Sequence, residues 1–293
     1  MSSLAVRAAL ASVAVALLLI LLKTQAALAT GSVAMLGSLA DSGLDLVASL
    51  VTLFGVRVAA TPADEDHRFG HGKAEALAAL FQVVLITLSA IGIAWRAVVQ
   101  LASGARTAHA EYGIAASLVA LAATFALLSY QRRVIRATGS LAIRTDNIHY
   151  TSDVLLNGSV MVALVLDQLL HVRAADALFG VGIALWLMWG AWRASASAID
   201  QLMDREWPEE KRQRFLAAAA RHPELRGIHD LRTRTSGTRD FVQFHVWVAP
   251  EMTVAEAHRV MDEIEAKLRL EFPGVEVLIH PDPEGYTDGG LAG

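Results

Sequence analysis

Long apolar runs fill roughly the first two hundred residues of the chain, whereas apolar and charged residues alternate beyond Asp204. Each run reaches the ~20 residues that a helix needs to cross a bilayer. We expect membrane-spanning helices at about 6–29, 33–60, 75–102, 112–130, 141–169 and 175–200. The pattern predicts a membrane all-α bundle of six transmembrane helices.

The remainder of the chain has the pattern of a small α+β domain. Helical periodicity alternates there with period-two strands. The expected elements are a helix at 208–221, strands at 227–235 and 240–249, a helix at 253–270 and a strand at 275–281. We therefore predict a transmembrane domain at 1–206, a cytoplasmic αββαβ, metallochaperone-like domain at 207–284 and a flexible tail at 285–293.

The composition fits a membrane protein, because 54% of the residues are hydrophobic and only 18% are charged. A net charge of -4, with no basic cluster interleaved with aromatic residues, argues against a nucleic-acid partner. The chain has no cysteine, so it forms no disulfide and offers no thiolate ligand. Any bound metal must be held by histidine, carboxylate, carbonyl or water, which favours zinc, iron or manganese over copper(I).

The arginines indicate the orientation of the bundle. An even number of spans places both termini on one side, and cytoplasmic loops carry an excess of Lys and Arg. The loops near Arg106 and Arg173 carry one arginine each, whereas the region joining the fourth and fifth spans carries four. Those four are Arg132, Arg133, Arg136 and Arg144. Both termini are therefore expected in the cytoplasm.

The first span has a second interpretation. Arg7, the apolar run that follows it and the small residues of Ala27-Leu28-Ala29 also resemble a cleavable signal peptide. The apolar region is longer than the ~7 to 15 residues of such peptides, which favours a membrane helix.

Two of the predicted spans carry ionisable residues four positions apart, Asp41 with Asp45 and His149 with Asp153. This spacing places both side chains of a pair on one helical face, so two such helices can enclose a metal ion with four ligands. A charge at mid-bilayer costs roughly 2.5 to 3.5 kcal/mol. Helix–helix hydrogen bonding does not require three carboxylates. The pattern therefore favours a metal site over a purely structural contact.

The ligand types of this site indicate the ion. Three carboxylates and one imidazole suit a tetrahedral borderline cation such as Zn²⁺, whereas Mg²⁺ or Ca²⁺ calls for oxygen ligands. With three ionised aspartates and a neutral histidine, the empty site carries three negative charges and should take up protons. The same residues therefore predict an exchange of metal for protons.

A second group of potential ligands lies in the turn that follows Thr61-Pro62. It contains Asp64, His67 and His71 among other charged residues. A short His-rich tract of this kind is compositional evidence only. A metal site and a solvated, charged turn both fit the spacing.

Histidines also occur in the α+β domain. Strand alternation places His245 and His280 opposite the apolar face, so neither is expected in the core. His229 and His258 border apolar residues and also fit ordinary packed histidines. Spacing alone leaves open whether these four residues join Asp282 in one metal cluster.

Five longer motifs run through the chain. They are Leu39-Ala-Asp41-Ser-Gly-Leu-Asp45, Asp66-His-Arg-Phe-Gly-His71-Gly-Lys73-Ala-Glu75, His149-Tyr-Thr-Ser-Asp153, Asp176-Ala-Leu-Phe179 and His229-Asp-Leu-Arg-Thr-Arg234. Together they resemble the cation diffusion facilitators, close to the bacterial zinc and iron efflux proteins of that family. The resemblance implies a homodimeric, proton-coupled antiporter of the bacterial inner (plasma) membrane. It also implies a retained first helix and export of Zn²⁺, with Fe²⁺ and Cd²⁺ as further candidates.

The resemblance implies three metal sites. They are a transport site of Asp41, Asp45, His149 and Asp153, a loop site of Asp64, His67 and His71, and a binuclear cytoplasmic site of His229, His245, His258, His280 and Asp282. In the family pattern, Asp282 bridges two ions near the dimer contact. Pro281 departs from this pattern, because relatives can offer a polar contact there.

Three alternatives remain at this stage. A manganese transporter of the same family would usually have a carboxylate or amide at His149. An intramembrane protease could use aspartates on two helices, but the sequence has neither Gly-x-Gly-Asp nor His-Glu-x-x-His. A passive metal channel is the third alternative.

Overall fold

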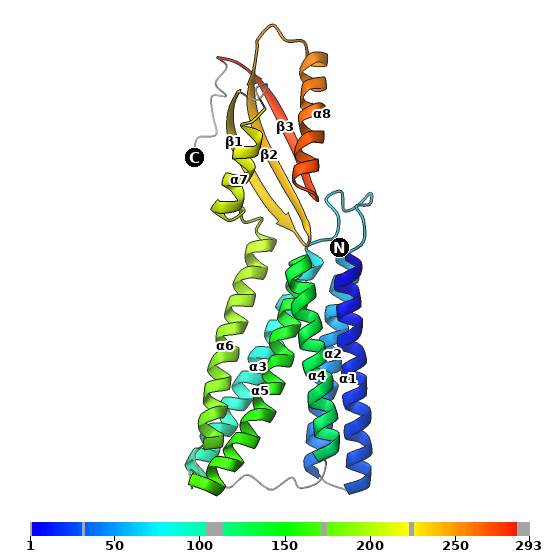
Figure 1. Cartoon of the computed structure of the whole chain (residues 1–293), viewed down its shortest axis with the longest axis vertical. Helices are drawn as coiled ribbons and strands as arrows, with labels where there is room; N and C mark the ends of the chain where they lie inside the picture. Colours follow the sequence, from blue (N-terminus) through cyan, green and yellow to red (C-terminus); the bar gives the residue numbers. More distant parts are fainter. Residues whose placement is uncertain (1, 31–32, 104–113, 171–174, 223–225, 286–293) are drawn as a thin grey trace. The chain divides into compact units, whose positions relative to one another are not determined.

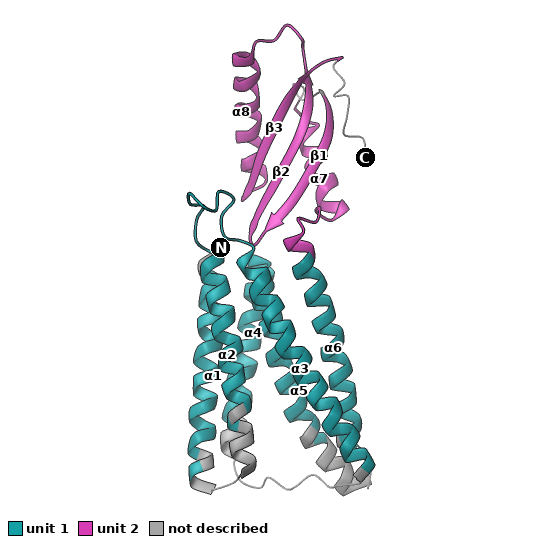
Figure 2. Ribbon diagram, turned by 180° about the vertical axis from the view of Figure 1, so that it is seen from behind, with its two compact units in different colours: residues 1–199 teal, residues 200–293 magenta. Residues whose placement is uncertain are grey.

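The computed structural model describes residues 2–30, 33–103, 114–170, 175–222 and 226–285 (Figure 1). These residues form two units, at 1–199 and 200–293, which are coloured separately in Figure 2. The predicted tail beyond residue 285 and the loops that carry Arg106 and Arg173 lie outside the described residues.

The first unit consists of long α-helices. They are α1 (Ser2–Thr30), α2 (Val33–Ala59), α3 (Ala74–Ser103), α4 (Ile114–Thr138), α5 (Leu141–Leu170) and α6 (Ala175–Leu202), which ends just beyond the unit boundary. Helix α1 packs against α2 and α4, and α5 packs against both α3 and α4. Buried residues of α3 and α6 share one apolar cluster, which contains Ile86, Ala90 and Leu187. Helix α5 therefore lies among several other helices, where polar side chains can be shielded from lipid.

Four of these helices are long and apolar enough to cross a membrane within the described residues. The spans are Leu4–Gln25, Asp41–Ala59, Ala74–Ala102 and Ala177–Leu202. Helices α4 and α5 are long enough as well, with 25 and 30 residues. However, α4 contains three arginines, and α5 contains an arginine and several polar residues such as Asp146 and His149. A helical membrane domain is thus confirmed, whereas the predicted number of six spans is not.

The second unit confirms the predicted αββαβ order. Its elements are α7 (Glu209–Ala219), β1 (Arg226–Ser236), β2 (Arg239–Val248), α8 (Val254–Glu271) and β3 (Val275–Pro283). The strands form one sheet in the order β1-β2-β3, with β1 antiparallel and β3 parallel to β2. Thr253 and Glu256 form a capping box that starts α8. Helix α8 is the crossover that the parallel pair requires.

The core of the second unit lies on one face of the sheet. Phe215 of α7 and Leu268 of α8 are fully buried there against Val242 and Phe244 of β2. The alternate residues of β2, such as His245, therefore lie on the opposite face. The apolar core thus leaves the other face of the sheet available for polar chemistry.

Replacing Phe215 with alanine is expected to lower the free energy of unfolding of the second unit by about 3 to 5 kcal/mol, because the change opens a cavity in its core. Hydrogen exchange of the β2 amides in the full-length protein measures the effect. Leu270→Ala, at a side chain that is 83% exposed, should change exchange little. Equal effects of the two substitutions would show that Phe215 does not hold this core together.

Candidate metal centres

Helices α2 and α5 bring three of the predicted ligands together inside the first unit. Asp45, His149 and Asp153 each offer a ligand atom, and these atoms lie within 4.8 Å of one another. His149 Nε2 lies 2.9 Å from Asp45 Oδ1, and both side chains are largely buried. Two carboxylates and one imidazole, drawn from two helices, form a donor set that suits a divalent transition metal.

Asp41, the fourth predicted ligand, lies one turn before Asp45 and is exposed. Within the described chain it is not part of the close group formed by the other three residues. Near this end of α2, Lys23 Nζ of α1 donates a hydrogen bond to Ser42 Oγ at 2.6 Å. The single chain therefore shows three of the four predicted ligands together.

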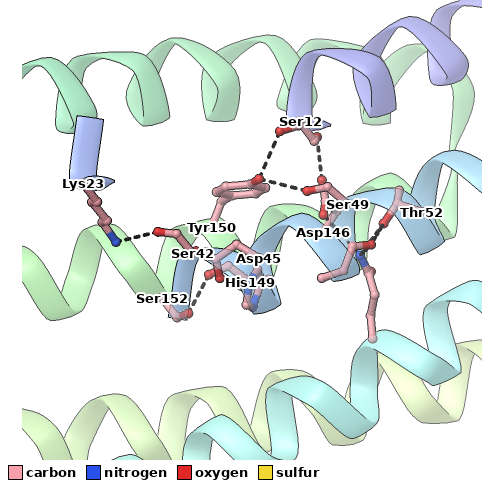
Figure 3. A network of polar contacts seen from close by, with 12 residues as sticks. Ser12, Lys23, Ser42, Asp45, Ser49, Thr52, Asp146, His149, Tyr150 and Ser152 are labelled. Carbon is pink, nitrogen blue, oxygen red and sulfur yellow. Dashed lines mark hydrogen bonds and ion pairs between the residues drawn. The ribbon is translucent and has the colours of Figure 1, made fainter. Parts of the chain in front are cut away.

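A buried polar network lies beside this group (Figure 3). Asp146 is fully buried and accepts hydrogen bonds from Ser12 Oγ at 2.7 Å, Gln82 Nε2 at 3.1 Å and Gln131 Nε2 at 2.7 Å. Tyr150 lies between the network and His149, and its hydroxyl is 2.9 Å from Ser49 Oγ. The network joins five helices, α1 to α5, beside the segment of α5 that carries His149 and Asp153.

The sequence analysis did not single out Gln82 and Gln131, although both lie within apolar helices. An amide side chain inside a membrane helix is itself a signal, because lipid cannot satisfy its hydrogen bonds. Both glutamines are almost completely buried and donate to Asp146. The carboxylate of Asp146 is thus the common acceptor that links α3 and α4 to α5.

Glu75 of α3 caps the start of α5. Its Oε2 accepts hydrogen bonds from Ser140 Oγ at 2.7 Å and from the backbone N–H of Leu141 at 3.1 Å. Glu75 is only 3% exposed. A carboxylate stabilises a helix N-terminus through the unpaired N–H groups there. The contact fixes α5, and with it His149 and Asp153, against α3.

The turn between α2 and α3 brings Asp64, His67 and His71 together. Asp64 Oδ1 lies 3.3 Å from His67 Nδ1, and Asp64 Oδ2 lies 3.3 Å from His71 Nε2. The backbone N–H of His67 donates to Asp64 at 2.6 Å, which lowers the pKa of this carboxyl below its ordinary value. A carboxylate that stays ionised between two imidazoles is a suitable anchor for a divalent cation.

Three histidines form a row across the sheet of the second unit. The strand register pairs His229 with His245 and His245 with His280. The ring centroids are 5.5 Å apart for the first pair and 4.7 Å apart for the second. Side chains opposite one another on neighbouring strands lie on the same face. The row therefore occupies the face that the core leaves free.

His229 reaches this face because β1 is irregular. The pairing of β1 with β2 shifts on both sides of His229, and such bulges change which way a side chain points. Trp247 stacks on the His229 ring with centroids 4.3 Å apart. Gly227 has a positive φ of 55°, and a Cβ there would overlap the Trp247 ring. Strict alternation, which left a packed His229 possible, does not hold at this position.

Asp282 joins the row of histidines. Its Oδ2 lies 2.8 Å from His245 Nδ1 and 3.2 Å from His229 Nε2, and its Oδ1 lies 3.3 Å from His280 Nε2. Burial alone would raise the pKa of Asp282, but the hydrogen bond from His245 and the nearby histidine charges outweigh it and lower the pKa. The two oxygens face different histidines, as a bridging carboxylate would.

His258 lies apart from this group within the described chain. It belongs to α8, which packs on the apolar face of the sheet, and it is 77% exposed. Its Nε2 is 3.6 Å from Asp262 one turn further along α8. The sequence spacing gave no information on which face of the sheet α8 would cover, and only the family resemblance grouped His258 with the sheet histidines.

Replacing Asp282 with asparagine is expected to destabilise the metal-free second unit at neutral pH but not in strong acid. Because the folded-state pKa of Asp282 is lowered, its stabilising contribution is complete above its unfolded value of about 3.9. That contribution is lost as the pH falls through the lowered pKa. Hydrogen exchange of β3 against pH measures the difference between wild type and variant. A stability difference between wild type and variant that stays constant down to pH ~2 would show that the ionised Asp282 carboxylate does not stabilise this unit.

Known proteins resemble this chain along almost its entire length. A family model described as "Cation efflux transmembrane domain" matches residues 9–203, and one described as "Cation efflux protein, cytoplasmic domain" matches residues 207–284. The cation-efflux pump FieF of Yersinia pestis (strain Pestoides F) is 44% identical over 276 residues, which cover 94% of this chain and 92% of that pump.

Two solved structures match part of the chain. A zinc form of CzrB is 39% identical and covers 29% of this chain and 97% of that chain, with a TM-score of 0.27. The metal-bound C-terminal domain of the CzcD transporter from Thermotoga maritima is 24% identical and covers 28% of this chain and 100% of that chain, with a TM-score of 0.26.

These findings decide between a transporter and an enzyme. The two family models leave only the chain ends and residues 204–206 unmatched. Proteins of this family are transporters, so the intramembrane protease interpretation is wrong. The chain belongs to the cation efflux family, the cation diffusion facilitators.

Proposed function

We propose that this protein is a secondary antiporter that moves Zn²⁺ out of the cytoplasm in exchange for protons. The observation that supports it most is the group of Asp45, His149 and Asp153, whose ligand atoms lie within 4.8 Å inside a helical membrane domain. Asp41, one turn from Asp45, is the proposed fourth ligand. The imidazole favours Zn²⁺ over Mn²⁺, and Fe²⁺ and Cd²⁺ are further substrates of the same donor chemistry.

Charge balance supports the exchange of metal for protons. Three ionised aspartates and a neutral histidine carry three negative charges when empty and one when a divalent cation is bound. Uncompensated charge inside a membrane domain is costly, so the empty site is neutralised by protons. Loss of those protons then favours metal binding, because ligands bind in their deprotonated forms.

We further propose six membrane-spanning helices, with both termini in the cytoplasm and the protein in the bacterial inner membrane. Helices α4 and α5 would cross despite their polar residues, because α5 directs its polar residues toward other helices. The transport domain would comprise 1–206 and the cytoplasmic domain 207–284. The arginines at the α4–α5 turn support this orientation through the positive-inside rule.

The other two groups are proposed as cytoplasmic metal sites. The loop group of Asp64, His67 and His71 would bind one ion, and the sheet histidines would bind a pair bridged by Asp282. Metal bound in the second unit would stabilise a homodimer and bias transport through linkage. If His245→Ala with Asp282→Ala left dimerisation and the metal dependence of transport unchanged, this regulatory role would be disproved.

Zinc uptake into proteoliposomes tests the proposed function. We expect an imposed pH gradient to drive Zn²⁺ uptake against its own gradient, and we expect a proton carrier that removes the pH gradient to stop it. Uptake that follows only the zinc gradient would identify a passive channel. Faster gradient-driven transport of Mn²⁺ than of Zn²⁺ would instead identify the manganese transporter that His149 argues against.

A further inference from the structure

A basic pocket lies between three helices of the membrane domain, and none of the proposed metal ligands lines it. Its volume is about 340 Å³. Four arginines line it, Arg132 and Arg136 of α4, Arg144 of α5 and Arg193 of α6, together with Trp186 and Trp189. Pockets of roughly 300 to 1,000 Å³ are the size that holds small ligands.

The residues that line this pocket do not balance its charge. No acidic residue lines it, and within the part of the chain that the structure describes, none of the four arginines forms an ion pair. The Arg193 guanidinium lies over the Trp189 ring at 4.9 Å from its centroid. Four like charges around one cavity repel one another unless an anion enters. Guanidinium groups bind phosphate oxygens in a bidentate manner.

The pocket lies at one end of the helices. Arg136 is in the last turn of α4, Arg144 is in the first turn of α5, and Arg193 is in the last third of α6. At Gly190, α6 approaches α5 so closely that an added Cβ would lie 3.3 Å from the Ile148 side chain. This contact closes one wall between the two helices. Arginine and tryptophan together are typical of the headgroup level of a membrane.

The neighbouring surface of α6 is strongly apolar. Leu185 is 68% exposed and Trp192 is 70% exposed, and Met188 between them is exposed as well. Each of these residues directly precedes a residue that lines the pocket, so the apolar surface lies beside the pocket at the same level of α6. Helix α6 is also apolar enough to span a membrane. A ligand with a charged head and hydrocarbon tails fits both parts, whereas a free anion fits only the pocket.

We propose that this pocket binds the phosphate headgroup of an anionic glycerophospholipid, whose acyl chains lie along α6. The phosphate would offset part of the positive charge of the four arginines and connect the α4–α5 turn to α6. Binding of this kind follows from the attraction of basic pockets between membrane helices to anionic lipid heads. It rests only on the membrane domain, so it can fail while the transport proposal holds.

Native mass spectrometry of the full-length protein in neutral detergent tests the proposal. The probes are phosphatidylglycerol, phosphatidylcholine and inorganic phosphate. We expect phosphatidylglycerol to bind wild type, and Arg144→Gln with Arg193→Gln to weaken it by about thirtyfold. The control pair, Arg57→Gln with Arg133→Gln, removes the same charge from exposed residues that do not line the pocket and should bind like wild type.

Three results would overturn the proposal. They are equal loss of binding in the two double variants, equal binding of phosphatidylcholine and phosphatidylglycerol, and inorganic phosphate that binds as tightly as the lipid. The last result would identify a site for a soluble anion. If the glutamine pair did not fold, Arg193→Gln alone should weaken phosphatidylglycerol binding about fivefold. Arg144→Lys with Arg193→Lys, which keeps the charge but not the bidentate geometry, should restore only part of the affinity.

Discussion

Zinc uptake into proteoliposomes is expected to fall by more than about 100-fold when Asp153 is replaced by asparagine. Loss of a residue that only supports a metal ligand already costs roughly 10- to 100-fold, and Asp153 is a proposed ligand. The amide keeps the size of the side chain but removes the charge that holds both the metal and the exchanged proton. Initial rates under a fixed pH gradient, normalised to the amount of inserted protein, measure the change.

Asn157→Ala provides a matched control on the same helix. Asn157 is one turn beyond Asp153, is exposed and donates to the Asp153 backbone carbonyl at 2.8 Å. Its loss should leave uptake within a few-fold of wild type. Asp41→Asn decides whether the site has three or four ligands. If Asp41 is the fourth ligand, this variant should lose as much zinc uptake as the Asp153 variant. Normal uptake by the Asp153 variant would disprove the proposed transport site.

Replacing Asp146 with leucine is expected to lower the free energy of unfolding of the membrane domain by roughly 2 to 5 kcal/mol. The substitution removes the shared acceptor of Gln82 and Gln131 in a fully buried site, and each unsatisfied donor costs about 1 to 3 kcal/mol. Equilibrium unfolding of the detergent-solubilised protein measures the loss of stability, with hydrogen exchange of the α5 amides as the signal.

A double-mutant cycle distinguishes the network from simple packing at Asp146. Gln131→Leu with Asp146→Leu removes a donor together with its acceptor, so the pair should cost less than the sum of the single substitutions. Costs that add without any coupling would show that the 2.7 Å contact between Gln131 and Asp146 contributes nothing specific.

The α+β unit was the part most accessible from sequence. Its strands are amphipathic, so the alternation of Val242, Phe244 and Val246 with His245 fixes the face of each residue without any knowledge of the fold. Alternation alone could not place His229, because a bulge adds a residue without leaving a periodic trace. Only the family resemblance grouped His258 with the sheet histidines, because spacing along α8 carries no information about packing across the sheet.

The membrane site was accessible only in part. Helical spacing placed Asp45 beside Asp41 and His149 beside Asp153, but only the packing of α2 on α5 determines which pair of residues meets. Gln82 and Gln131 are separated from Asp146 by many residues and were recognisable only as isolated amides in apolar segments. Contacts between helices depend on three-dimensional packing that periodicity within one helix does not encode.

The row of three histidines makes the cytoplasmic unit sensitive to strand alignment in a way that its core is not. Sliding one strand by two residues returns every side chain to its original face, so an apolar core tolerates the error to a large degree. The same slide would separate His229, His245 and His280, which lie opposite one another only in the observed register. Metal binding at the proposed site would therefore distinguish correctly aligned copies from misaligned ones, because misaligned copies could retain a buried core and still fail to bind an ion.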